Sequence, residues 1–117
     1  MLHLRGESDV ASFDASIFLK TPVFSFVYVE DCPWCKRMMG EWLKLAKTPP
    51  KGVLLIMIEL PALKPLMDLL KGVDARDRFG HVTTVPAIDL HRKKQRRVAF
   101  QGERVAETMR TFVEKRL

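Results

Sequence analysis

The sequence contains few cysteines, no long apolar run and no secretory leader pattern. Only two of its 117 residues are cysteine, Cys32 and Cys35, so no third cysteine is left for a structural disulfide. The longest apolar run covers residues 53–58, whereas a transmembrane helix needs about 18 apolar residues, so we expect no membrane insertion. No basic start is followed by a continuous apolar stretch and a small-residue cleavage site. We therefore favour a cytoplasmic location, where a cysteine pair is catalytic rather than structural.

The overall composition is that of an ordinary globular protein. The chain is 47% apolar and 29% charged, which is typical of a folded rather than a disordered chain. A chain of this length can bury a core without disulfide bonds. We find no internal repeat, low-complexity segment or linker, and predict a single, monomeric domain over residues 1–117.

The two cysteines form the motif Cys32-Pro33-Trp34-Cys35. A disulfide that closes so short a loop stabilises a fold very little. A C-x-x-C pair near a β-α-β pattern is instead typical of redox chemistry. An inert pair remains an alternative.

A metal site is a second alternative for the cysteine pair. A structural zinc ion needs four ligands, and the other soft candidates are His3, His81 and His91. Their spacing does not fit a zinc motif, so we expect no metal and no cofactor. His81 is assigned to a loop, with an acid–base role as an alternative.

The residues around the motif predict a reactive thiol. An apolar, β-branched segment at residues 23–29 is expected to be a buried strand, and residues 33–47 have helical periodicity. Pro33 suits the first turn of that helix, which places Cys32 at the N-cap beside free backbone N–H groups. The helix dipole and the charge of Lys36 favour the Cys32 thiolate, which is the nucleophilic form. Cys35 lies one turn further in, as suits a resolving thiol.

Strands and helices alternate along the chain. Strands are expected at residues 1–4, 23–29, 53–59, 87–91 and 97–101, and helices at residues 10–19, 33–47, 60–70, 74–79 and 103–117. Two of these helices carry an apolar stripe, formed by Val10, Phe13, Ile17 and Phe18 in the first and by Val105, Met109, Phe112, Val113 and Leu117 in the last. Pro65 is expected to make the helix at residues 60–70 irregular. This order predicts the α/β class, with a mixed central sheet and helices on its faces.

The predicted order of strands and helices, with a C-x-x-C pair at the start of the helix at residues 33–47, resembles the thioredoxin family. The resemblance covers nearly the whole chain. Cys35-Lys36 matches the end of the thioredoxin motif, and Gly40 stands where the family has a helix-kinking proline. The resemblance implies the thioredoxin fold and the activity of a thiol-disulfide oxidoreductase. It also implies protein disulfides as substrates and a thioredoxin reductase or another dithiol donor as partner.

Two further segments carry the resemblance. Thr84-Val85-Pro86 is similar to the family's cis-proline loop, and Gly102 follows at the spacing of the glycine beside the active site. The resemblance implies that Val85 and Pro86 hold the substrate backbone. It also implies that Trp34 and Gly102 complete a flat apolar docking surface.

Two positions and the length of one segment depart from the thioredoxin pattern. Asp31 replaces the aromatic residue that usually precedes the first cysteine, and Phe26 replaces a buried aspartate thought to deprotonate the resolving cysteine. Asp89 is a candidate substitute for that acid, but we expect it at a sheet edge with its carboxylate in water. The segment between residues 59 and 86 is also longer than usual.

The linker Pro-Trp and the Thr-Val-Pro loop are closer to glutaredoxins, which makes glutathione-coupled turnover an alternative. The glutaredoxin Gly-Gly pair before the last helix is absent, because the sequence there is Gln101-Gly102-Glu103.

The basic charge is concentrated in one predicted hairpin turn. The formal net charge is +6, and five cationic side chains lie within six residues, namely Arg92, Lys93, Lys94, Arg96 and Arg97. A solvated turn is the favoured interpretation, and a binding module that docks an anionic partner is the alternative. We expect no nucleic acid partner, because no stacking aromatic residue stands beside the cluster. In a thioredoxin-like topology this turn lies away from the cysteines.

Overall fold

A five-stranded mixed sheet forms the centre of the molecule. The computed structural model describes the backbone of residues 1–117 and the side chains of all except residues 72–74. The strands are β1 (Leu2–Leu4), β2 (Val23–Tyr28), β3 (Leu54–Glu59), β4 (Ala87–His91) and β5 (Val98–Ala99), in the spatial order β1-β3-β2-β4-β5. β3 is parallel to β1 and to β2, whereas β4 is antiparallel to β2 and to β5. The predicted class and sheet type are confirmed.

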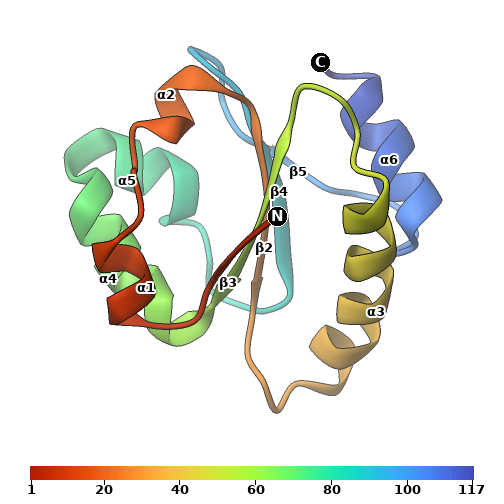
Figure 1. The fold of residues 1–117 in the computed structure, drawn as a ribbon, viewed down its shortest axis with the longest axis horizontal. Coiled ribbons are helices and arrows are strands. Elements are labelled where there is room, and N and C mark those ends of the chain that lie inside the picture. Colours follow the sequence, from red (N-terminus) through yellow and green to blue (C-terminus); the bar gives the residue numbers. More distant parts are fainter.

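Helices cover both faces of this sheet (Figure 1). The helices are α1 (Glu7–Ala11), α2 (Ile17–Lys20), α3 (Pro33–Lys47), α4 (Leu60–Leu70), α5 (Gly72–Phe79) and α6 (Ala106–Glu114). α3 and α6 lie on one face, and the other four lie on the opposite face. None of the helices that the structure describes is long and apolar enough to cross a membrane.

β2 is the middle strand, and all six of its residues are buried. Because successive side chains of a strand point to opposite faces, β2 contributes to two separate cores. Phe24, Phe26 and Tyr28 face α3 and α6, whereas Val23 and Val27 face the other helices. This two-sided burial explains why the segment is apolar at nearly every position.

The two cores differ in composition. The core under α3 and α6, which we call the α3/α6 core, contains Cys35 and a group of large aromatic side chains, namely Phe24, Phe26, Tyr28, Trp42 and Phe112. The opposite core is mainly aliphatic and packs α1, α2 and α4 against the sheet. The reactive cysteine pair therefore lies on the aromatic side of the molecule.

The single helix predicted at residues 10–19 is wrong, because the chain forms two short helices there. Asp14 ends the helical pattern: its side-chain oxygen accepts hydrogen bonds from the backbone N–H of Ser16 at 3.0 Å and from the Ser16 hydroxyl at 2.6 Å. Such a local turn competes with the helix for backbone donors. The apolar face was identified correctly, since Val10 and Phe18 are buried in the same core.

Two other helices differ from prediction. The last helix begins at Ala106 rather than at residue 103, and Val105 and Leu117 of the predicted stripe are exposed. α4 runs without interruption through Pro65. Proline removes one helical hydrogen bond, but the helix continues, and Leu63 and Leu66 on either side of Pro65 are buried.

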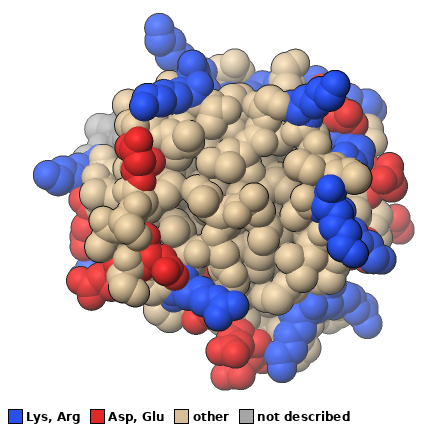
Figure 2. Space-filling view, in the orientation of Figure 1, with Lys and Arg blue, Asp and Glu red and all other residues tan. Residues whose placement is uncertain are grey.

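The basic hairpin turn and the cysteines lie at opposite ends of the molecule. In Figure 1 the β2–α3 connection is at the bottom and the turn between β4 and β5 is at the top. Figure 2, in the same orientation, shows Lys and Arg side chains projecting at the top of the molecule. The middle of the face seen in this view is uncharged. The expected separation of the basic turn from the cysteines is confirmed.

Candidate active site

Cys32 is the N-cap residue of α3, as the sequence predicts. Its backbone is extended, and Pro33 occupies the first turn of the helix. The Cys32 sulfur accepts a hydrogen bond from the backbone N–H of Cys35, with a distance of 3.3 Å between Sγ and N. This bond satisfies one of the free N–H groups at the start of the helix and directs positive partial charge at the sulfur.

Cys35 lies one turn further along α3 and is completely buried, whereas Cys32 is partly exposed. Both cysteines are free thiols in the structure. The two sulfur atoms are therefore not equivalent: a substrate can reach Cys32, and Cys35 can be reached only from Cys32 or from the interior.

The pKa values of the two thiols differ as well: that of the partly exposed Cys32 is lowered and that of the buried Cys35 is raised. The hydrogen bond with Cys35 and those from the backbone N–H groups of Cys35 and Trp34 lower the pKa of Cys32, with a smaller contribution from the charge of Arg104. Burial and the hydrogen bond with Cys32 raise the pKa of Cys35 to about 11. Cys32 is thus the thiol that ionises first and Cys35 is the thiol that keeps its proton.

Arg104 is a site residue that the sequence analysis did not identify. Its charge lowers the pKa of both cysteines, so it lies near the pair although it is far away in sequence. The only signal in the sequence was its position two residues after Gly102. Arg104 is exposed and stands in the connection between β5 and α6.

We expect the rate of Cys32 alkylation by iodoacetamide to rise with pH through a midpoint below the ordinary value for cysteine. The rate follows the thiolate fraction, and a lowered pKa moves that fraction to lower pH. Arg104→Gln should move the midpoint to higher pH, because it removes a positive charge that stabilises the thiolate. Lys51→Gln, in the turn at the far end of α3, is the matched control and should leave the midpoint unchanged. Equal midpoints in both variants would contradict the role of Arg104.

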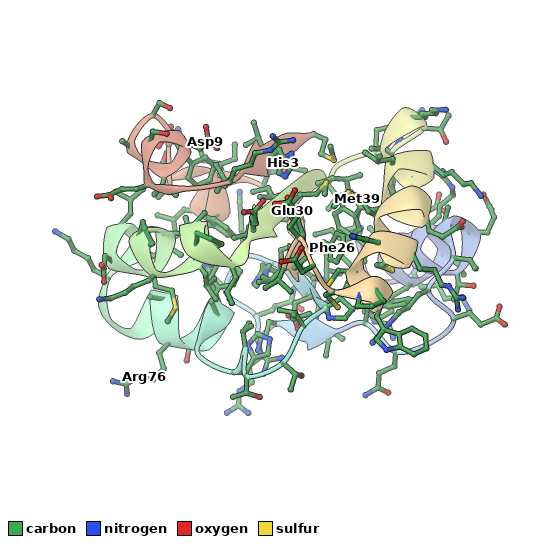
Figure 3. All side chains as sticks on the ribbon, turned by 90° about the horizontal axis from the view of Figure 1, so that it is seen from below. His3, Asp9, Phe26, Glu30, Met39 and Arg76 are labelled. Carbon is green, nitrogen blue, oxygen red and sulfur yellow. The ribbon has the colours of Figure 1, made fainter. Side chains whose placement is uncertain are left out.

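The core that contains Cys35 holds mainly apolar side chains and, among its described residues, no carboxylate. Phe26 is buried and pairs in register with Met57 of β3, which is buried as well, and both belong to the α3/α6 core that contains Cys35. Figure 3 shows Phe26 near the centre of the molecule, with Met39 of α3 close by. The position where the resemblance expects a buried acid therefore holds a phenyl ring, which cannot accept the Cys35 proton.

Asp89 does not replace that acid, and its expected position at a sheet edge is wrong. Asp89 lies in β4 between two other strands and is only 2% exposed. Its carboxylate is hydrogen-bonded to His81 Nε2 at 2.8 Å and accepts a bond from Arg97 Nη1 at 3.2 Å. Its neighbours Ile88 and Leu90 point into the α3/α6 core, so Asp89 points to the face away from the cysteines. Burial was not evident from the sequence, because both partners come from other segments.

Trp34 and the Val85–Pro86 loop are residues for which the resemblance implies contacts with the substrate. Trp34 is 62% exposed, and the guanidinium carbon of Arg37 lies 5.6 Å from its ring centroid. The Val85–Pro86 peptide bond is cis, and Val85 packs against the α3/α6 core, as Cys32 also does.

Pro33, Lys36 and Gly102 are exposed. Gly102 has a φ of +140°, and a Cβ atom there would lie 3.1 Å from Cγ2 of Thr108. Any other residue at this position would be strained, so the close approach of the chain to α6 requires glycine.

The zinc alternative finds no support in the geometry. Among the residues whose side chains are described, no group of three or more His, Cys, Asp or Glu residues is arranged to hold a metal ion. His81 is engaged with Asp89, and His91 with Ser25 at 2.8 Å. Both lie on the face of β4 that points away from the cysteines.

Comparison with known proteins identifies the fold. No protein-family model and no curated protein sequence matches the chain. The structure is similar to the germline-specific thioredoxin Deadhead from Drosophila melanogaster, with a TM-score of 0.67, 16% identity and coverage of 100% of both chains. It is also similar to the J-Trx1 fragment of ERdj5, with a TM-score of 0.71, 18% identity and coverage of 97% of this chain and 49% of the fragment, so the chain spans about half of that fragment.

A third similar structure is the first thioredoxin domain of mouse protein disulfide-isomerase A4. Its TM-score is 0.60 at 23% identity, with coverage of 86% of this chain and 67% of that domain. At such low identity these similarities establish the architecture and not the activity. The chain has the thioredoxin fold, with a Cys-x-x-Cys pair at the amino end of α3.

Proposed function

We propose that the protein is a thiol-disulfide oxidoreductase that acts on protein disulfides. The observation that carries the proposal is the asymmetry of the cysteine pair: Cys32 is partly exposed, caps α3 and has a lowered pKa, whereas Cys35 is buried and has a raised pKa. An attacking thiol needs access and thiolate character, and a resolving thiol must stay protonated until the first step is complete.

Reduction of a substrate takes two exchange steps. In the first, the Cys32 thiolate attacks one sulfur of the substrate disulfide, a mixed disulfide forms, and the second substrate sulfur leaves as a thiolate. In the second, Cys35 loses its proton and attacks the Cys32 sulfur, which closes the Cys32–Cys35 bridge and releases the other substrate thiolate. The substrate gains two electrons, and the protein dithiol loses two. A dithiol donor must then reduce the bridge, and the reverse sequence oxidises a dithiol.

The geometry couples the two steps. Two of the causes that raise the pKa of Cys35 are its hydrogen bond with Cys32 and the negative charge of the Cys32 thiolate. Both are lost when the Cys32 sulfur is bonded to the substrate. The pKa of Cys35 therefore falls at the stage where its thiolate is required, although Phe26 offers no acceptor for the proton. The proton is passed to solvent or to the leaving thiolate of the substrate.

Substrate contacts are part of this proposal. Val85 and Pro86 would hold an extended segment of the substrate by backbone contacts next to Cys32. Trp34 would supply apolar contact, since its ring is largely exposed and lies between the two cysteines in sequence. Gly102, which carries no side chain, would complete a flat docking surface together with Trp34.

Trapping the mixed disulfide tests the proposal. Cys35→Ser should form a stable, dithiothreitol-sensitive adduct with insulin that carries its disulfides, because the second exchange step cannot occur. The adduct is measured by non-reducing electrophoresis and mass spectrometry. The control is Cys32→Ser/Cys35→Ser, which has no thiol and should form none. The absence of an adduct in folded Cys35→Ser would contradict the assignment.

The electron donor is tested separately, because the Cys-Pro-Trp-Cys motif is closer to the glutaredoxin pattern than to the thioredoxin pattern. We expect a flavin-dependent thioredoxin reductase to regenerate the dithiol faster than glutathione does, since the Gly-Gly pair typical of glutaredoxins is replaced by Gln101-Gly102. Faster regeneration by glutathione would assign the protein to the glutathione-coupled class.

A further inference from the structure

A large basic cleft lies on the part of the molecule away from the cysteines. Its volume is about 780 Å³, and it is formed by residues 76–78 of α5 and by residues 91–97 at the end of β4 and in the hairpin turn. Among the described side chains, six cations and one carboxylate line it, contributed by Arg76, Arg78, Arg92, Lys94, Arg96, Arg97 and Asp77. Much of the positive charge of the exposed turn therefore faces one concave site, which it shares with α5.

The cleft has two walls that are distant in sequence. Arg76 and Arg78 come from α5, and Arg96 and Lys94 come from the hairpin turn. Asp89 already pairs with Arg97, and Asp77 stands among the lining residues. The remaining like charges from the two segments repel each other, and an anion placed between them would relieve that repulsion. This arrangement favours a ligand that is held from both sides.

Two buried polar atoms of the cleft residues have no hydrogen-bond partner among the described side chains. One is Nε of Arg92, a charged donor, whose guanidinium is held in place by the bond from Nη1 to the carbonyl of Arg116 at 3.2 Å. The other is Nδ1 of His91, whose ring is fixed by the contact of Nε2 with the Ser25 hydroxyl at 2.8 Å. A charged donor without a partner is costly to bury, so Nε of Arg92 can bind an acceptor that a ligand supplies.

The surroundings of His91 show how positive this region is. Burial, together with the smaller effects of the charges of Arg78, His81 and Arg97, lowers the pKa of His91 to about 3. His91 is therefore neutral and does not add to the repulsion. The arginines of the cleft remain charged at every physiological pH.

We propose that this cleft binds a small molecule that carries two or more phosphate groups. Guanidinium groups match phosphate oxygens through paired hydrogen bonds, and five of the six cations are arginine. The volume is in the range of sites for drug-sized ligands and is larger than one phosphate needs. No Phe, Tyr or Trp lines the cleft, so it lacks the stacking platforms that bind single-stranded nucleic acid.

The test is a calorimetric titration of the full chain with inorganic tripolyphosphate at low ionic strength. Arg76→Gln/Arg96→Gln removes one charge from each wall. Both side chains are exposed, neither makes a hydrogen bond within the described residues, and Figure 3 shows Arg76 pointing away from the body of the molecule. We expect this variant to bind at least about tenfold more weakly. Lys47→Gln/Lys51→Gln changes the net charge equally outside the cleft and should weaken binding by less than about twofold.

A second measurement locates the ligand. The Nε–Hε resonance of Arg92 should shift on addition of tripolyphosphate, because the ligand provides the missing acceptor. Orthophosphate should bind more weakly, since it engages one wall at a time.

Three results would overturn the proposal: no binding by the wild-type protein, equal weakening in the two double variants, or binding of a single-stranded thymidine oligonucleotide in place of tripolyphosphate. The last would point to nucleic acid as the ligand. None of these readouts involves the cysteines, so failure here leaves the proposed redox function untouched.

Discussion

Replacing Cys32 by serine is expected to lower the rate of disulfide reduction by at least about a thousandfold, because a serine hydroxyl does not ionise near neutral pH and cannot attack a disulfide. The loss should be larger than that of any other single substitution at the site, since every exchange step passes through the Cys32 sulfur. The measurement is the reduction of insulin followed by turbidity, with dithiothreitol as electron donor.

The loss must arise from chemistry and not from unfolding. Cys32 is partly exposed and serine can accept the same N-cap hydrogen bond from the N–H of Cys35, so the circular dichroism spectrum and the melting temperature should stay close to those of the wild type. Full activity in the folded Cys32→Ser protein would remove Cys32 from the mechanism and leave the thioredoxin fold as a scaffold.

Trp42→Ala is expected to have the largest effect on stability, about 3–5 kcal/mol. Trp42 is fully buried, and its ring centroid lies 5.1 Å from that of Phe24 and 5.4 Å from that of Phe26. Truncation leaves a cavity between α3 and the sheet, and the loss is a large fraction of the 5–15 kcal/mol typical of a whole domain. The free energy of unfolding is measured by urea denaturation followed by circular dichroism.

Leu43→Ala is the matched control for this substitution. Leu43 is the next residue of α3, but its side chain is 44% exposed on the outer surface of the helix. Its removal should change the free energy of unfolding by less than about 1 kcal/mol. Similar losses in the two variants would mean that α3 does not pack on the sheet through its Trp42 side.

Around the cysteines, local sequence signals were sufficient to predict the helix and the buried strand that precedes it. The helix at residues 33–47 was predicted with both ends correct, because Pro33 and the N-cap Cys32 mark its start and Thr48-Pro49-Pro50 marks its end. The burial of β2 was also evident, since a strand covered on both faces is apolar throughout. The mixed sheet followed from the order of these elements.

Other features depended on partners far away in the sequence. The burial of Asp89 depends on His81 and Arg97, and the influence of Arg104 on the cysteines depends on how the chain after β5 returns past α3. The sequence pattern around one residue does not tell how far that residue lies from a partner in a distant segment.

The helix prediction at residues 10–19 failed for a different reason. The apolar spacing was helical, but a short-range bond of Asp14 outweighed it.

The position of Cys32 at the start of a helix was thus determined by the sequence alone, because capping and hydrophobic period act over a few residues. Only the tertiary structure decided what surrounds that thiol and that the basic residues of α5 and of the hairpin turn line one cleft. Charge and burial act through space, and the distances on which they depend are set when the sheet and its helices pack.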